Sequence, residues 1–242
     1  MALLFLCSIV APISIPVYAS DFPNHDQVIR DFISGDVSDI AAVIEASEYY
    51  NNADLSQVGY TTSIDDNGRL TATQIIPSST VSRTSSNATE VASATLMVLN
   101  RNGEEIVYTD YDTESNNYSE YAIYAVHTAY YTLTQDSLLD GFDVKVTKIT
   151  TKFTYNGSIR AYNLYQHYAA TEDYLTIYDH ATSSTISAPV SGHIYTFYPG
   201  GESHPLGIGY IDTESFYTIS NKQFSLKVRA SLSYNDWTHI IN

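Results

Sequence analysis

Cysteine is scarce in this sequence. The single cysteine, Cys7, lies in an apolar stretch at the N-terminus, so the rest of the chain can form no internal disulfide and offers no thiol chemistry. A chain of 242 residues is nevertheless long enough to bury a sizeable core without crosslinks. Exported animal domains usually carry disulfides, so a cysteine-free exported domain is more typical of a bacterium.

Positive charge is also scarce. Eleven Lys and Arg residues face 27 Asp and Glu residues, which gives a formal net charge of −16. Nucleic acids and anionic membranes are repelled by such a surface, so we expect neither as a partner. The simplest role of this charge is solubility outside the cell.

The sequence contains none of the common catalytic motifs. G-x-S-x-G, H-E-x-x-H and the P-loop are absent, and the segment Gly201–Pro205 departs from a nucleophile elbow because it ends in proline. The seven histidines are scattered singly. We expect His127 and His167, on predicted strands, to lie at a sheet edge or core margin and not to bind metal, and we expect no cofactor.

The N-terminal stretch has the character of an export signal. Residues 1–20 are largely apolar and end in Val17-Tyr18-Ala19, with small side chains at the positions that signal peptidases prefer. Pro12 and Pro16 disfavour a stable membrane-spanning helix, although the usual basic start is missing. We therefore expect residues 1–19 to be a signal peptide and the mature protein to be secreted, extracellular and free of the membrane.

Apolar spacing predicts helix in only one region, residues 20–52. Asn24 or Asp26 is placed to cap its start, Gly35 interrupts it, and Ser38 offers a second N-cap, so we expect two short helices packed on the rest of the domain. The residues at three- and four-residue spacing are Val28, Ile29, Phe32, Ile33, Ile40, Val43 and Ile44.

The region 53–242 is dominated by alternating apolar and polar residues. Asn67-Gly68, Asn102-Gly103 and Asn156-Gly157 each separate two such segments, which predicts type I′ hairpins. The longest of these hairpins spans residues 142–168, and we expect it to organise the sheet. The sequence thus predicts a mainly β protein, an antiparallel, sandwich-like domain with a short helical segment at its N-terminus.

Two strands stand out within this region. In residues 120–134 apolar and aromatic side chains occupy both faces, which is typical of a central strand covered on both sides. In residues 223–234 the apolar side chains alternate with Lys227 and Arg229, which we expect to face solvent.

Two acidic clusters are the candidates for metal binding. Asp110, Asp112 and Glu114 place carboxylates at every second position, as Ca²⁺ ligands require, but Ser115 replaces the glycine of an EF-hand loop. Asp65 and Asp66 precede the first Asn-Gly pair. A solvated turn in an acidic protein explains either cluster equally simply.

Three strand-like phrases, YAVHTAYYTLT, VKVTKITTKFTYNG and FSLKVRASLSYN, carry a family resemblance. Together with the leader and the helical start, they resemble uncharacterised secreted proteins of Gram-positive gut and soil bacteria. The resemblance covers roughly the second half of the chain. It implies a secreted setting and a mainly β fold, and no activity or functional residue.

Three functions remain open for this protein. The 22 tyrosines and the lack of a catalytic motif favour a non-enzymatic binding or interaction protein whose partner is an extracellular protein or a glycan. Tyrosines clustered on an exposed flat face would support it. The alternative is a secreted carboxylate-dependent hydrolase such as a glycosidase, which needs two carboxyl groups roughly 5–10 Å apart in a cleft. A secreted antagonist of competing bacteria is a third possibility.

Overall fold

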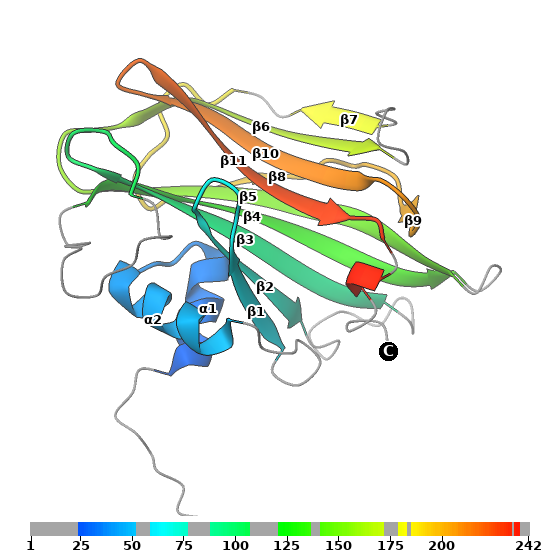
Figure 1. Ribbon diagram of the computed structural model, residues 1–242. Coiled ribbons are helices and arrows are strands. Elements are labelled where there is room, and N and C mark those ends of the chain that lie inside the picture. The colour runs from blue at the N-terminus through cyan, green and yellow to red at the C-terminus, as the bar shows by residue number, and fades with distance from the viewer. Residues whose placement is uncertain are drawn as a thin grey trace, which may run out of the picture.

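The protein consists of two stacked antiparallel β-sheets, with two helices against the outer face of the larger sheet (Figure 1). This computed structural model describes residues 24–51, 59–76, 88–106, 121–136, 141–171, 179–182, 185–233 and 235–237. The expected signal peptide lies outside these residues. The mainly β, antiparallel fold with a short N-terminal helical segment is as the sequence predicts.

The larger sheet is a meander extended by two later strands. It contains β1 (Tyr60–Ile64), β2 (Leu70–Ile76), β3 (Ala88–Asn100), β4 (Tyr121–Asp136), β5 (Gly141–Tyr155), β8 (Ile194–Phe197) and the short β9 (His204–Pro205). The first five follow one another in space, and β8 and β9 both pair with β5. The smaller sheet has the order β11-β10-β6-β7 and contains β6 (Ala161–Thr171), β7 (Asp179–Thr182), β10 (Tyr210–Ile219) and β11 (Lys222–Ser231).

The two helices are α1 (His25–Ser34) and α2 (Ile40–Tyr50). The Asn24 side chain caps α1 by accepting from the Gln27 amide, and Gly35 ends it in the left-handed conformation, with φ 86°. The second N-cap is Asp39, whose carboxylate accepts from the Ala41 amide, and not the predicted Ser38. Both helices bury their apolar faces on the larger sheet.

The predicted long hairpin about Asn156-Gly157 is wrong. β5 pairs with β4 along its whole length, the Asn156 amide still bonds to the carbonyl of Ala122 on β4, and β6 pairs with β10 in the other sheet. The connection through Gly157, at φ 110°, therefore carries the chain from one sheet to the other. In this arrangement β5 and β6 pack against each other across the core, where Phe153 and Leu164 belong to the same buried cluster.

The other two Asn-Gly turns do join hairpins, with a different geometry from the one predicted. Gly68 and Gly103 have φ angles of 74° and 75°, while the asparagine before each keeps a negative φ. The Gly68 amide bonds to the Asp65 carbonyl at 2.9 Å, so the turn is followed by a left-handed glycine bulge. The two-residue turn with two positive φ angles is Ser220-Asn221, between β10 and β11.

Apolar side chains of the larger sheet fill two layers of core. On its outer face, Tyr124 and Val126 of β4 pack with the helices. On its inner face, Tyr131 and Leu133 belong to the cluster that the smaller sheet covers. The prediction that β4 is a central strand buried on both faces is confirmed.

Candidate ligand-binding face

Three aromatic rings lie together on the outer face of the smaller sheet. Tyr165 and His167 on β6 and Phe216 on β10 point away from the core, and we call them the ring platform. The His167 and Phe216 rings stack with centroids 5.2 Å apart at 15°, and Tyr165 lies 6.3 Å from Phe216. Their register follows from the sheet, because Phe216 pairs directly with Tyr165. The rings thus form a half-buried aromatic cluster on this face.

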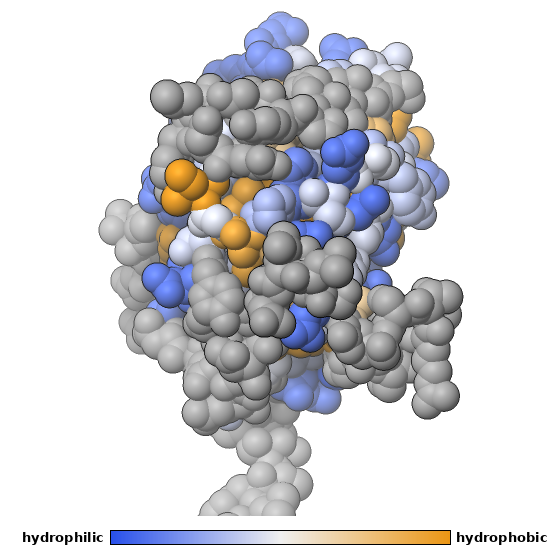
Figure 2. Space-filling view, turned by 90° about the vertical axis from the view of Figure 1, so that its right-hand side faces the viewer, coloured by the Kyte–Doolittle hydropathy of each residue, from blue (hydrophilic) through white to orange (hydrophobic). Residues whose placement is uncertain are grey.

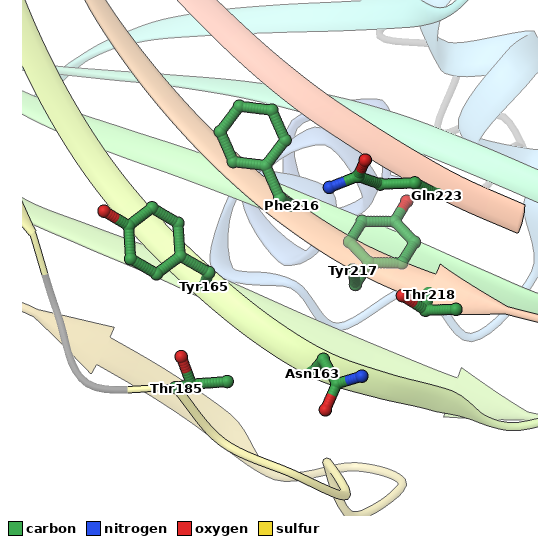
Figure 3. Close-up of a pocket in the computed structure, with 7 residues that line it drawn as sticks. All are labelled: Asn163, Tyr165, Thr185, Phe216, Tyr217, Thr218 and Gln223. Carbon is green, nitrogen blue, oxygen red and sulfur yellow. The ribbon is translucent and has the colours of Figure 1, made fainter.

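A shallow depression of about 500 Å³ adjoins the ring platform (Figure 3). Figure 3 shows Tyr165 and Phe216 beside one another, with the Gln223 amide near Phe216 and with Asn163 and Thr185 on the opposite side. Its lining consists of Asn163, Tyr165, Thr185, Phe216, Tyr217, Thr218 and Gln223. The depression therefore presents aromatic carbon, amides and hydroxyls, and none of the lining side chains carries a formal charge.

A backbone irregularity shapes this depression. Between the pairs Phe216–Tyr165 and Thr218–Tyr162, two steps along β10 match three along β6, so β6 holds a bulge. Asn163 occupies this bulge in the left-handed region, with φ 55°, which few non-glycine residues adopt. Its amide bonds to the Ser187 carbonyl at 3.0 Å, which fixes the segment carrying Thr185 beside β6. Bulges of this kind re-aim side chains next to functional sites.

Charged residues continue the same face toward β11. Arg229 donates two hydrogen bonds to Asp212, at 2.7 and 2.9 Å, and its guanidinium lies 3.8 Å over the Tyr210 ring. The hydrogen bond to Asp212 raises the pKa of Arg229. Lys227 lies between Asp212 and Glu214, at 3.4 and 3.9 Å. This half of the face is thus an ion-pair network, in contrast to the uncharged depression.

His127 lies in the core and not at the expected margin, and burial lowers its pKa to about 3. Thr213 donates to the Val228 carbonyl, so its oxygen accepts from His127 Nε2 at 3.0 Å. Nδ1 then accepts from Ser215 at 2.7 Å. The chain continues through Thr151, 2.6 Å from Ser215, to the Gln166 amide. Ser215 and His127 are hydrogen-bonded as in an activated serine nucleophile. Both side chains are nevertheless enclosed in the core, and no described cavity reaches them.

The remaining residues singled out in the sequence do not converge. Asp110, Asp112 and Glu114 lie outside the described residues. Asp65 accepts from the amides of Asn67 and Arg69, so its carboxylate stabilises the first hairpin turn. His204, in the segment compared with a nucleophile elbow, is buried with Nε2 2.6 Å from the Tyr168 hydroxyl.

Neither a candidate metal cluster nor a membrane-spanning helix is found among the described residues. These residues contain no cluster of three or more His, Cys, Asp or Glu side chains that would hold a metal ion. Within the same ranges, no helix has both the length and the apolar character needed to cross a bilayer.

Several described tyrosines of the sheets are part of the core. Tyr131, Tyr168 and Tyr217 are among the largest fully buried side chains, and burial raises the pKa of Tyr217. Large apolar side chains with high exposure are scattered, such as Tyr198 at 69%. On the end of the sandwich seen in Figure 2, hydrophobic residues form only a small group among hydrophilic ones. The described tyrosines therefore do not form one broad exposed face, and the ring platform contains a single tyrosine.

The sequence does not predict the ring platform. Tyr165 and His167 are two residues apart, which places them on one face of a strand, but the pattern does not reveal which face is covered. Phe216 reaches them only through the β6–β10 pairing.

Comparison of the chain with protein-family models, with curated proteins and with solved structures found no match.

Proposed function

We propose that this protein is a secreted, non-enzymatic binding protein that holds a neutral glycan on the outer face of its smaller sheet. The observation that supports this proposal is the ring platform beside an uncharged depression lined by amides and hydroxyls. Secretion rests on the N-terminal sequence alone.

The chemistry of a sugar ring matches these two halves. One face of a pyranose presents C–H groups that pack on an aromatic ring, and its rim carries hydroxyls that donate and accept hydrogen bonds. Asn163 and Gln223 each carry both an amide donor and a carbonyl acceptor, and Thr185 and Thr218 add hydroxyls. A neutral glycan avoids both the ion pairs beside the site and repulsion by the net charge of −16.

The hydrolase alternative stays a prediction. On this face the nearest carboxylates, Asp212 and Glu214, project from the same side of one strand and are ion-paired with Lys227. Glycosidases place their two carboxyl groups on opposite sides of the scissile bond. The described geometry therefore favours binding over cleavage.

A glycan array probed with the mature protein tests the proposal. We expect retention on at least one class of neutral glycan. Phe216→Ala should weaken binding about tenfold or more, because loss of an aromatic stacking surface costs roughly 1–2 kcal/mol. Tyr198→Ala removes a more exposed ring outside the platform and is the matched control. Absence of retention on any glycan, or equal binding by the Phe216→Ala variant, would refute the proposal.

A further inference from the structure

The larger sheet extends beyond the smaller one at the β1–β2 side. β11 is the edge strand of the smaller sheet and packs across β3 and β4, so no strand of the smaller sheet faces β1 and β2. A polar groove of about 480 Å³ occupies this place. Its lining is Ser63, Asp65, Asp66, Asn67, Thr71, Thr73, Ser93, Ala94, Lys227, Val228 and Arg229. The groove thus lies where one more strand of the smaller sheet would fit.

Among the described residues, no strand pairs with the outer edge of β11, which borders this groove. In an antiparallel pair, alternate residues direct both their N–H and C=O groups to the same neighbour. The Val228 carbonyl points toward β10, where it accepts from Thr213, whereas the Ser225 carbonyl points away and accepts from Arg69. Lys227 and Arg229 have the same parity as Ser225. Their backbone groups therefore face the groove, and no described backbone group bonds to them there.

A side chain bonds to a backbone carbonyl at each end of this edge. At one end, Arg69 donates to the Ser225 carbonyl at 2.7 Å and is held by Glu105, whose carboxylate accepts from Nε at 2.6 Å. At the other end, Trp237 Nε1 donates to the Ser231 carbonyl at 2.6 Å. The unpaired edge is therefore a defined slot that runs from Ser225 to Ser231.

The floor of the groove is a row of hydroxyls on the inner face of the larger sheet. Ser63 bonds to Thr71 at 2.6 Å, and Thr73 bonds to Ser93 at 2.9 Å. Side chains of an added strand that point toward this floor would meet polar groups, so small hydroxyl or amide side chains fit best. Those pointing outward would lie beside Lys227 and Arg229, whose side chains are 41% and 51% exposed.

We propose that this slot binds an extended segment of a partner polypeptide, which adds a strand to the smaller sheet along β11. The backbone groups of Lys227 and Arg229 supply the hydrogen bonds, and the hydroxyl floor selects small polar side chains. Lys227 and Arg229 are already ion-paired with Asp212 and Glu214, and Asp65 and Asp66 line the groove, so an uncharged segment fits best. A second copy of β11 is a poor occupant. Antiparallel pairing about Val228 would place Lys227 of each chain opposite Arg229 of the other, and directly opposed like charges are unfavourable.

Selection from a displayed library of random peptides, roughly eight residues and about 26 Å long when extended, tests this proposal on the full mature chain. We expect enriched peptides to be uncharged and to carry small polar residues at alternate positions. Lys227→Pro removes an outward N–H without removing a β10–β11 hydrogen bond, and should raise the Kd about tenfold or more. Thr73→Tyr fills the groove by an independent route and should do the same. Lys227→Ala keeps the N–H and should bind peptides with nearly unchanged affinity.

Several results would overturn the proposal. These are the absence of any enriched peptide, full binding by both the Lys227→Pro and Thr73→Tyr variants, or self-association through β11 in sedimentation experiments. Phe216→Ala, in the ring platform, should leave peptide binding unchanged. This outcome separates the slot from the proposed glycan site, and a loss of peptide binding in this variant would contradict two independent sites.

Discussion

Replacing His127 with glutamine should change how the stability of the protein depends on pH. Burial lowers the pKa of this histidine from 6.5 to about 3, so the folded protein keeps the ring neutral where the unfolded chain binds a proton. The stability that depends on the neutral ring is therefore complete above about pH 6.5. It is lost as the pH falls from there toward the folded pKa, because the unfolded state binds more protons.

The size of this effect follows from the width of the pH window. Each pH unit between the two pKa values changes the free energy of unfolding by about 1.4 kcal/mol, so acidification from pH 7 to 4.5 costs the parent about 2.5 kcal/mol through this one residue. Any folded pKa below about 4 gives nearly the same value. His127→Gln also disturbs the bonds to Ser215 and Thr213, which should destabilise the variant by about 1–3 kcal/mol at pH 7.

Urea unfolding of both proteins at several pH values, followed by the fluorescence of the single tryptophan, Trp237, measures the difference directly. Titration of the other groups is common to both proteins and cancels in this difference. We expect the parent's advantage at pH 7 to shrink by about 2.5 kcal/mol at pH 4.5. Parallel stability curves over this range would show that His127 is not held neutral in the core.

Three further predictions concern stability. Gly157→Val should lower the free energy of unfolding more than Gly68→Val does, because the φ angle of Gly157, 110°, lies farther from the left-handed well than the 74° of Gly68. Such strain costs on the order of 1–2 kcal/mol. Thermal or urea unfolding measures both losses, and equal losses would contradict this prediction. Arg69→Ala should destabilise the protein by about 2–4 kcal/mol, because it removes a largely buried ion pair with Glu105. Lys152→Ala should cost less than about 1 kcal/mol, because the carboxylate of its partner, Asp36, is 78% exposed. Similar losses in the two variants would show that Arg69 does not connect the two sheets. Because burial raises the pKa of Tyr217 and of other core tyrosines, stability should fall as the pH rises above about 10, and absorbance should show these tyrosines ionising only with unfolding.

The helices and most strands were predictable because their signals are local. Asn24 and Gly35 mark the ends of α1 by capping and left-handed geometry, and both faces of β4 read as buried in the sequence. The pairing of strands is not a local property. β5 and β6 flank a strong turn signal, yet β5 pairs with the preceding strand, β4, and β6 pairs with the much later β10 in the other sheet.

For the same reason, the sequence does not predict the candidate site. An exposed and a buried aromatic residue look alike in an alternating strand, and Phe216 meets Tyr165 only after β10 has paired with β6. The left-handed Asn163 arises from a bulge that has no signature of its own in the sequence. By contrast, the outward position of Lys227 and Arg229 was predicted, since the alternation around them is regular.

The alternation of the two sheets along the chain has a consequence for the growing polypeptide. After β5 the chain passes to the smaller sheet for β6 and β7, returns to the larger one for β8 and β9, and passes back for β10 and β11. An incomplete chain that ends before β10 leaves the apolar inner face of β3, β4 and β5 without much of its cover, and exposed strands of this kind aggregate readily. Folding of the sandwich must therefore wait for the last strand to be synthesised, and the protein should be slow to fold for its size.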